Sequence, residues 1–148
     1  MKFMEKEEII VKNSGWVKLS AFPDKRGLLV VGEIEEEIPF AVKRIFYITD
    51  LENSTHLERG GHAHRKTDQI IFCLKGSFLL GLDDGEIKQE ILLNDHTIGV
   101  RLGPSLWHTM KNFSSDCVIL VLANQCYEKF DYLRDYSQFL EFIKESND

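Results

Sequence analysis

Short apolar runs separated by turn-forming residues fill most of this chain of 148 residues. Residues 28–31, 40–48 and 117–122 are rich in β-branched and aromatic side chains, which favour strands. Asp83, Asp84 and Gly85 stand between two such runs and predict a hairpin turn. Many short strands joined by turns are typical of an antiparallel sandwich or barrel, and the length is that of one domain. The sequence therefore predicts an all-β fold in a single domain over residues 1–148.

Only the carboxy-terminal tail shows the periodicity of a helix. The apolar residues that recur at helical spacing are Leu133, Tyr136, Phe139, Leu140 and Ile143. Asp135 stands where an N-cap residue is expected, with Gln138 three residues later. We therefore expect a short carboxy-terminal α-helix that packs on the outside of the barrel through this apolar stripe.

Composition and charge restrict the function. The formal net charge is -6, which argues against general nucleic-acid binding, although local arginines can still create a site for an anion. No apolar run is long enough to span a bilayer, and the charged residues 1–8 do not resemble a signal peptide. Cys73, Cys117 and Cys126 form no Cys-x-x-Cys pair, and the first two lie in apolar runs. We expect a cytoplasmic protein with buried reduced thiols and with no nucleic-acid or membrane partner.

Two histidines one residue apart, His62 and His64, lie in the stretch 59–69, which leads directly into an apolar run. Alternate side chains of a strand point to the same face, so their Cβ atoms would lie roughly 7 Å apart. Two imidazoles on one face serve either as proton carriers or as metal ligands, and the residues alone leave both readings open. His56 and His96 lie in polar loops, where we expect them to be solvated.

Two motifs around these histidines resemble those of the cupins. His62, His64, Gln69 and Gly76 stand at the spacing of the first cupin motif, with Gln69 in place of the usual glutamate. Residues 103–112 resemble a degenerate second cupin motif. The resemblance implies a cupin double-stranded β-helix, an antiparallel jelly-roll barrel, which agrees with the pattern of strands.

Five segments narrow the resemblance to one group of cupins, the nucleotide-sugar 3,4-ketoisomerases that act on dTDP-4-oxo-6-deoxyglucose. The segments that stand in the order seen in that group are residues 43–48, 59–64, 82–85, 106–108 and 131–136. The resemblance implies an isomerase of deoxysugar biosynthesis for O-antigen or S-layer glycans, with a dTDP-linked 4-keto-6-deoxyhexose as substrate. It also implies a homodimer, with or without exchange of an amino-terminal strand between subunits.

The resemblance also assigns roles to three histidines. A 3,4-ketoisomerase removes a proton from C3, forms an enediol and returns a proton to C4, and histidine titrates in the right range for such transfers. By resemblance, His62 is the carbon acid–base residue and His64 serves the oxygen atoms. His108 would orient the sugar or one imidazole. The reaction requires no cofactor, and the resemblance implies no metal.

Several residues are candidates for binding the nucleotide diphosphate and the sugar, because arginine forks suit phosphate oxygens and polar or aromatic groups suit the rest. The candidates are Arg44, Tyr47, Arg59, Arg65, Gln69, Arg101, Trp107 and His108. Arg44 and Arg59 match positions of the family, whereas surface salt bridges are the alternative for Arg65 and Arg101. Core packing is the alternative for Trp107.

Two other functions remain open at the level of sequence. A metal-dependent cupin enzyme would use His62, His64 and His108 as ligands, although the neutral Gln69 supplies no charge to offset a cation. A non-catalytic nucleotide-sugar-binding cupin would keep the fold without turnover. Nucleotide-sugar epimerases, a related cupin class, use a His–Asp pair, and the sequence shows no matching arrangement.

Overall fold

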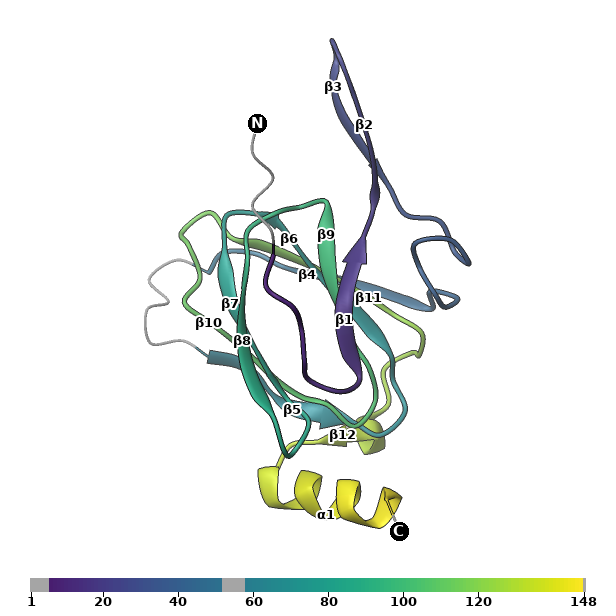
Figure 1. Ribbon diagram of the computed structural model, residues 1–148, viewed down its shortest axis with the longest axis vertical. Coiled ribbons are helices and arrows are strands. Elements are labelled where there is room, and N and C mark those ends of the chain that lie inside the picture. Colours follow the sequence, from purple (N-terminus) through teal and green to yellow (C-terminus); the bar gives the residue numbers. More distant parts are fainter. Residues whose placement is uncertain (1–5, 52–57, 148) are drawn as a thin grey trace.

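The computed structural model describes residues 6–51 and 58–147 and consists mainly of antiparallel strands (Figure 1). The strands are β1 (Ser14–Lys18), β2 (Ser20–Asp24), β3 (Gly27–Val31), β4 (Arg44–Ile48), β5 (Glu58–His64), β6 (Gln69–Lys75), β7 (Phe78–Asp83), β8 (Lys88–Leu93), β9 (Ile98–Leu102), β10 (Trp107–Lys111), β11 (Val118–Ala123) and β12 (Tyr132–Leu133). A short 3-10 helix, η1 (Lys129–Asp131), precedes β12, and α1 (Tyr136–Ser146) is the carboxy-terminal helix.

Two five-stranded sheets face one another and form the barrel. One sheet has the strand order β1-β9-β6-β11-β4 and the other has the order β12-β5-β10-β7-β8. The predicted hairpin turn at residues 83–85 joins β7 to β8, which pair antiparallel from Phe78 and Leu93 to Asp83 and Lys88. The predicted all-β jelly-roll architecture is confirmed.

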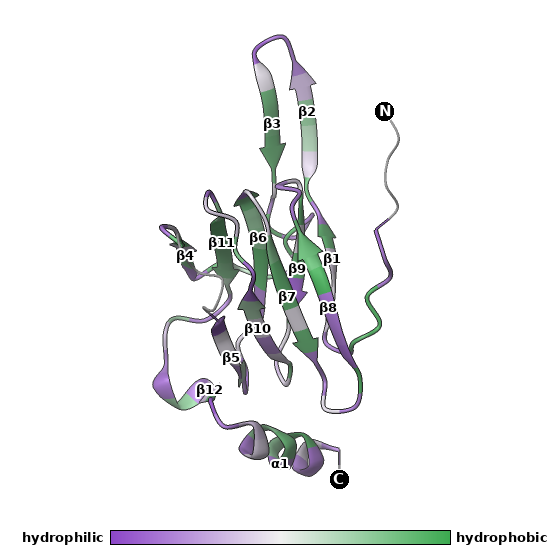
Figure 2. Ribbon diagram, turned by 90° about the vertical axis from the view of Figure 1, so that its left-hand side faces the viewer, coloured by the Kyte–Doolittle hydropathy of each residue, from purple (hydrophilic) through white to green (hydrophobic). Residues whose placement is uncertain are grey.

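The core lies between the two sheets and follows the two-residue period of the strands. In β11, Ile119 and Val121 are buried in the core, whereas Leu120 and Leu122 are only half-buried. Cys73 and Cys117 are buried free thiols of the same core, as expected. Figure 2 shows hydrophobic residues along the strands and hydrophilic residues at many of the turns.

Helix α1 lies below β5 and β12 at one end of the barrel (Figure 1). Asp135 caps its first turn by accepting hydrogen bonds from the backbone N–H groups of Ser137 and Gln138, so the predicted cap is confirmed. Phe139 is fully buried in a small cluster with Ala63 of β5, and the helix therefore covers the outer side of the strand that carries His62 and His64. No helix within residues 6–51 or 58–147 is long and apolar enough to cross a membrane.

The histidine strand and the apolar run after it are separate elements that a turn connects. β5 ends at His64, and β6 begins at Gln69 in the opposite sheet. Between them the backbone N–H of Arg65 donates a hydrogen bond to the carbonyl oxygen of Asp131, at 2.8 Å. The turn over residues 65–68 places the two halves of the first cupin motif on facing walls of the barrel.

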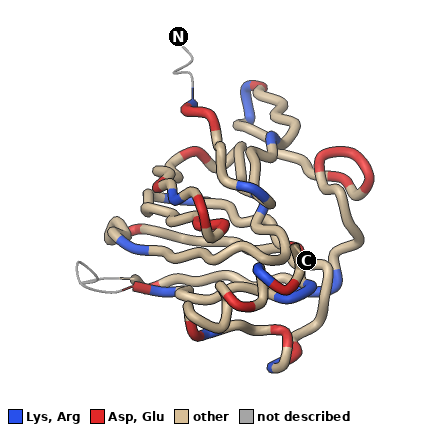
Figure 3. Tube along the Cα trace, turned by 60° about the horizontal axis from the view of Figure 1, so that its bottom comes forward, with Lys and Arg blue, Asp and Glu red and all other residues tan. Residues whose placement is uncertain are grey.

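The β2–β3 hairpin projects beyond the barrel (Figures 1 and 2). Among the described strands, β2 and β3 pair only with each other. The side chains of Phe22 and Leu29 are 57% and 63% exposed, although both are strongly apolar. The acidic residues 33–37 follow in an outer loop, as expected, and Figure 3 shows this loop as one of several acidic stretches at the periphery.

Candidate active site

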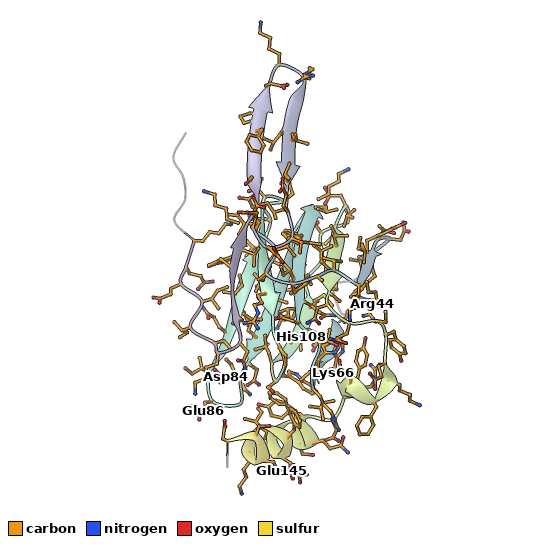
Figure 4. All side chains as sticks on the ribbon, turned by 90° about the vertical axis from the view of Figure 1, so that its right-hand side faces the viewer. Arg44, Lys66, Asp84, Glu86, His108 and Glu145 are labelled. Atoms are coloured by element: carbon orange, nitrogen blue, oxygen red, sulfur yellow. The ribbon has the colours of Figure 1, made fainter. Side chains whose placement is uncertain are left out.

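Three histidines from two neighbouring strands meet inside the barrel. β5 contributes His62 and His64, and β10 contributes His108, which pairs directly with His62 across the strands. The ring centroids lie 5.1 Å apart for His62 and His64, 4.8 Å for His62 and His108, and 5.9 Å for His64 and His108. Figure 4 shows His108 within the barrel. Of the two remaining histidines, His96 is exposed, as expected, and His56 lies outside the described residues.

An irregular stretch of backbone brings these rings together. The pairing of β5 with β10 changes register between His108 and Thr109, and Gly60 and Gly61 have φ angles of 77° and 71°. A Cβ atom on Gly60 would lie 2.9 Å from the carbonyl oxygen of His108, so this approach requires glycine. Bulges of this kind commonly redirect side chains beside active sites. The two glycines therefore let the histidines of β5 reach the histidine of β10.

Two of the histidines, His62 and His108, line one wall of a pocket of about 470 Å³, a volume within the usual range for small-molecule sites, and His64 lies behind them. His62 and His108 form part of its polar lining together with Gln69, which is 3% exposed. The apolar lining comes mainly from the other strands and consists of Phe46, Ile48, Ile71, Leu102, Met110 and Val121. The pocket thus offers a few polar groups on an apolar background, as ligand sites commonly do.

A buried carboxylate holds His64. The Nδ1 atom of His64 lies 3.1 Å from Oδ2 of Asp131. Asp131 also accepts hydrogen bonds from the hydroxyl group of Thr67 and from the backbone N–H of Lys66. Because an ionised carboxylate only accepts, His64 donates through Nδ1–H, and its buried Nε2 atom, which has no partner among the described residues, keeps its lone pair. This pair corrects the expectation that the chain has no His–Asp arrangement.

All three rings are neutral at neutral pH. Burial lowers the pKa of His62 from 6.5 to about 4, and the neighbouring His64 and Arg134 act in the same direction. Burial also lowers the pKa of His64, although the hydrogen bond to Asp131 acts in the opposite direction, and burial lowers the pKa of His108 well below 6.5. The site therefore holds bases that can accept a proton. One ring nitrogen from each histidine lies within 4.8 Å of the others, so the same group could hold a metal ion.

Three arginines surround the same pocket: Arg44 of β4, Arg59 of β5 and Arg134 after β12. None of them forms an ion pair with a described residue. The Nη2 atom of Arg44 lies 3.4 Å from the hydroxyl oxygen of Tyr132, and within residues 6–51 and 58–147 its buried Nε atom has no hydrogen-bond partner. Figure 4 shows Arg44 on the side of the barrel that carries β4. Such cations create a positive field that suits an anionic ligand.

Two predicted ligand contacts, Tyr47 and Trp107, point away from the pocket. Tyr47 follows Phe46, which lines the pocket, so strand alternation turns the tyrosine outward, where it is 70% exposed. Trp107 precedes the inward-pointing His108 and faces outward for the same reason. Its ring centroid lies 5.2 Å from that of Tyr136 in α1. Trp107 therefore packs under the helix, in agreement with core packing, the alternative to ligand binding given above.

Arg101 and Arg65 also lie outside the lining of this pocket. The Nη2 and Nε atoms of Arg101 lie 2.9 Å and 3.0 Å from the carboxylate oxygens of Asp68. Arg65 lies over the rings of Phe130 and Phe142, 4.9 Å and 5.5 Å from their centroids. Arg101 therefore forms the salt bridge that was the alternative to ligand binding. Arg65 stacks on aromatic rings instead.

Two polar pocket residues that lie just before α1, Tyr132 and Arg134, carry no role from the sequence. Both line the pocket from the segment just before α1, and the guanidinium carbon of Arg134 lies 4.4 Å from the ring centroid of Tyr132. The Tyr132 ring also lies 5.0 Å from the ring of His62. The one signal in the sequence was that residues 131–136 form one of the five segments shared in order with the ketoisomerases. That resemblance indicates the segment but gives no function to its individual residues.

Comparison with known proteins agrees with this geometry. The family model described as "FdtA: WxcM-like, C-terminal" matches residues 12–144, nearly the whole chain. A TDP-4-oxo-6-deoxy-alpha-D-glucose-3,4-oxoisomerase from Aneurinibacillus thermoaerophilus is 46% identical over 124 residues, which are 84% of this chain and 88% of that protein.

Two solved structures extend the comparison. A variant of the 3,4-ketoisomerase QdtA from Thermoanaerobacterium thermosaccharolyticum, in complex with TDP-4-keto-6-deoxyglucose, is 34% identical with a TM-score of 0.87, over 92% of this chain and 97% of that chain. The RmlC epimerase of Mycobacterium tuberculosis is 16% identical with a TM-score of 0.71, over 87% of this chain and 72% of that chain. The second likeness concerns the fold alone.

Proposed function

The chain belongs to the FdtA family of WxcM-like, C-terminal proteins, and on this premise we propose that it is a 3,4-ketoisomerase acting on a TDP-linked 4-oxo-6-deoxyhexose. One observation carries the proposal. Three neutral imidazoles, those of His62, His64 and His108, meet at a pocket that is surrounded by arginines without acidic partners among the described residues. The neutral imidazoles suit proton transfer, and the arginines suit the binding of a nucleotide diphosphate.

The proposed reaction moves a carbonyl group from C4 to C3 of the hexose through an enediol. A base removes the proton from C3, and an acid protonates the oxygen of the C4 carbonyl. The enediol then gains a proton at C4 and loses the proton from the oxygen at C3. No electrons are gained or lost overall, so the reaction needs no redox cofactor. The site has to supply one proton carrier for the carbons and one for the oxygens.

His62 is the proposed carbon acid–base residue, and His64 is the proposed proton carrier for the oxygens. His62 lines the pocket, and its pKa of about 4 keeps it able to accept a proton at neutral pH. His64 has Nδ1 bound to Asp131 and an Nε2 atom without a partner among the described residues, so it can take the proton from the oxygen at C3 through Nε2 and pass it to the oxygen at C4. Asp131 would stabilise the imidazolium that forms when His64 holds a second proton. His108, whose Nδ1 atom lies 3.3 Å from the carbonyl oxygen of Leu106, would orient the sugar.

The arginines around the pocket are the proposed diphosphate site. Arg44, Arg59 and Arg134 approach it from different elements, and a diphosphate can accept several charge-assisted hydrogen bonds at once. The bound negative charge would also raise the pKa of His62 toward neutrality, which makes it a stronger base once the substrate is present. Gln69, buried in the same lining, offers an amide to the hydroxyl groups of the sugar.

A homodimer is part of the proposal. β1 pairs with β9 of its own chain, so an exchanged arm would be the β2–β3 hairpin, whose Phe22 and Leu29 are exposed. β4 is an edge strand, and its outward residues Ile45 and Tyr47 are 63% and 70% exposed. A second subunit would cover both the apolar β2–β3 hairpin and the unpaired edge of β4. An exposed sheet edge otherwise favours aggregation. Multi-angle light scattering at micromolar concentration should give the mass of a dimer, and a monomer would contradict this part of the proposal.

Turnover of the proposed substrate tests the function directly. We expect purified protein incubated with dTDP-4-oxo-6-deoxyglucose to give a 3-oxo isomer in the proton NMR spectrum, and the coupling constants of the product report the configuration at C4. The variant His96→Asn, in an exposed loop, should behave like the original protein. Binding without any turnover would support the alternative of a non-catalytic sugar-binding cupin.

A further inference from the structure

We infer that Thr67 is a positioning residue, because its hydroxyl group fixes the carboxylate of Asp131 behind His64. The carboxylate in turn keeps a proton on Nδ1 of His64 and leaves Nε2 free to exchange protons with the oxygens of the sugar. The effect on the tautomer of His64 stands on the geometry of these side chains alone, whereas the effect on turnover rests on the proposed function. Thr67 acts only through Asp131 and touches no reacting atom.

Four consecutive residues after the inward-pointing part of β5 surround one carboxylate. The Nδ1 atom of His64 and the hydroxyl group of Thr67 both contact Oδ2 of Asp131, and the backbone N–H of Lys66 donates to Oδ1 at 2.7 Å. The backbone N–H of Arg65 donates to the carbonyl oxygen of Asp131, at 2.8 Å. Figure 4 shows Lys66 at the end of the barrel that faces α1. The turn that follows β5 therefore closes around Asp131.

Hydrogen bonds alone hold the charge of this carboxylate. The exposed fractions of His64, Thr67 and Asp131 are 2%, 5% and 3%. No described Lys or Arg side chain forms an ion pair with Asp131. A buried charge is costly unless its hydrogen bonds are satisfied, and an ionised carboxylate only accepts, so the hydroxyl group of Thr67 donates. Among the described residues, Thr67 is the one side chain besides His64 that donates to Asp131.

The hydroxyl group restricts rotation of the carboxylate. The terminal torsion of an aspartate side chain has broad minima, so the hydrogen bond from Lys66 to Oδ1 alone would let Oδ2 turn away from His64. Thr67 holds Oδ2 at the place where it lies 3.1 Å from Nδ1 of His64. Thr67 is itself buried and β-branched, which limits its own χ1 angle. If Oδ2 moved, His64 could carry its proton on Nε2 and could then accept no proton there.

NMR spectroscopy tests the positioning without any assay of activity. Thr67→Val keeps the shape of the side chain and removes the hydroxyl group. Two-bond ¹H–¹⁵N correlation spectra of the imidazoles, recorded without substrate, report which nitrogen carries the proton, and the spectrum of His64→Asn identifies the signals of that ring. We expect the Nδ1–H form in the original protein and a mixture with the Nε2–H form in Thr67→Val.

Two further variants complete the spectroscopic test. Thr67→Ser retains the hydroxyl group and should restore the spectrum of the original protein. Thr67→Ala removes the same hydroxyl group with a smaller side chain and should change the tautomer as Thr67→Val does. It therefore supplies the same comparison if the valine variant does not fold.

Steady-state kinetics tests the effect on turnover. In Thr67→Val we expect kcat to fall roughly 10-fold, as for one lost hydrogen bond to a charged group. KM should change little, because the arginines around the pocket are untouched, and Thr67→Ser should keep most of the original kcat. In an Asp131→Asn background, Thr67→Val should lower kcat by less than about 2-fold, since residues that act through one contact are not additive.

Thr97→Val is the matched control, because it removes the same kind of hydrogen bond elsewhere. The hydroxyl group of Thr97 donates to Oδ1 of Asp95 at 2.7 Å, just before β9. This variant should be less stable towards urea, with the tautomer of His64 and kcat unchanged.

Three results would overturn the inference: an unchanged His64 tautomer in Thr67→Val, an equal loss of kcat in Thr97→Val, or additive losses of kcat in Thr67→Val and Asp131→Asn. Each would leave Thr67 with a purely structural role. If the tautomer changes as expected and the original protein turns over no sugar nucleotide, the proposed function fails and the positioning of His64 by Thr67 stands.

Discussion

The Nδ1 atom of His64 lies 3.1 Å from Oδ2 of Asp131, a residue 67 positions later in the chain. Both side chains are 2% exposed. Thr67 and the backbone N–H of Lys66 donate the other hydrogen bonds to the carboxylate. The contact fixes which nitrogen of His64 is free, and it places a negative charge beside a ring that the proposed reaction protonates transiently.

The first prediction concerns this contact. Asp131→Asn keeps the size of the side chain and removes its charge. We expect kcat to fall roughly 10- to 100-fold, because a hydrogen bond to a charged group contributes about 1.5–3 kcal/mol, while KM changes much less. The variant should also lower the pKa of His64 further, because the carboxylate of Asp131 partly offsets the lowering of that pKa by burial. Steady-state kinetics and a pH profile of kcat measure both effects.

Asp135→Asn is the matched control for this prediction. Asp135 caps α1, and asparagine caps a helix about as well as aspartate, so the replacement should preserve the helix and leave turnover unchanged. Unchanged kcat in Asp131→Asn would contradict the role given to the pair, and so would an equal loss of kcat in Asp135→Asn.

Sequence reasoning located the fold and the histidines because both depend on local patterns. Strand alternation and the turn at residues 83–85 predict an antiparallel sandwich or barrel, and the resemblance to the cupins narrows this prediction to the jelly roll. The cap at Asp135 is visible from the residue type and its spacing. His62 and His64 share a face because they are two residues apart on one strand.

The same alternation turns two of the predicted binding residues away from the pocket. His108 points into the barrel, so its neighbour Trp107 has to point out. Phe46 lines the pocket, so Tyr47 does not. Adjacent residues of a strand point to opposite faces, so they cannot both line one site from that strand. The sequence alone was enough to show this conflict.

Asp131 was beyond the reach of the sequence for a different reason. His64 stands at the end of β5, whereas Asp131 lies in the segment that precedes α1, so their contact joins two parts of the chain that are distant in sequence. Nothing in the spacing of the two residues indicates that these segments meet. The pairing depends on how the tail folds back over the end of the barrel, which is a property of the tertiary structure.

The second prediction concerns metal dependence. Exhaustive chelation followed by gel filtration should leave turnover unchanged, because the proposed proton transfers need only the imidazoles. Metal analysis of the chelated sample by mass spectrometry checks that the ion has been removed. If activity disappears on chelation and returns with one divalent metal, the metal-dependent cupin is the correct function and the neutral Gln69 has been misinterpreted.

The third prediction is the dependence of activity on pH. His62 acts as a base in its neutral form, and its pKa in the folded protein is lowered from 6.5 to about 4. Because kcat/KM reports the free enzyme, it should stay level from about pH 8 to about pH 5 and fall only as the pH approaches that pKa. A fall of kcat/KM centred near pH 6.5 would contradict the neutral, buried state of His62.

The same shift predicts a dependence of stability on pH. In the unfolded chain His62 should titrate near 6.5, so between this value and about 4 the unfolded state binds more protons than the folded state. The contribution of neutral His62 to stability is therefore complete above the unfolded pKa and is lost progressively as the pH falls to the folded pKa. Unfolding by urea at pH 7 and pH 5 should show a smaller pH effect in His62→Asn than in the original protein.

The fourth prediction concerns the arginines of the pocket. Arg44→Ala and Arg59→Ala should each raise KM more than they lower kcat, because a diphosphate clamp holds substrate and transition state about equally. The loss should be roughly 10- to 100-fold in KM, as for a hydrogen bond between charged groups, and it should shrink as salt is added. Arg65→Ala removes an arginine that stacks on Phe130 and Phe142 and should leave KM unchanged. A collapse of kcat at constant KM would instead place that arginine in the chemistry.

The last prediction concerns the proton carrier itself. His62→Asn keeps a hydrogen-bonding group of similar size and removes the ability to carry a proton near neutral pH. The barrel should stay folded, because the ring of His62 borders the pocket and lies outside the apolar core. TDP should still bind, because the arginines that surround the pocket are unchanged.

Isomerisation should then fall by roughly the 10²- to 10⁴-fold expected for a lost acid–base group. Exchange of the C3 hydrogen with deuterated solvent, followed by NMR, should fall with it, because His62 is the group assigned to the carbon atoms. His64→Asn should also impair turnover, but it can retain C3 exchange, since His64 is assigned to the oxygens. Full C3 exchange in a folded His62→Asn protein would move the carbon base to His64 or His108, the two imidazoles whose rings lie 5.1 Å and 4.8 Å from that of His62.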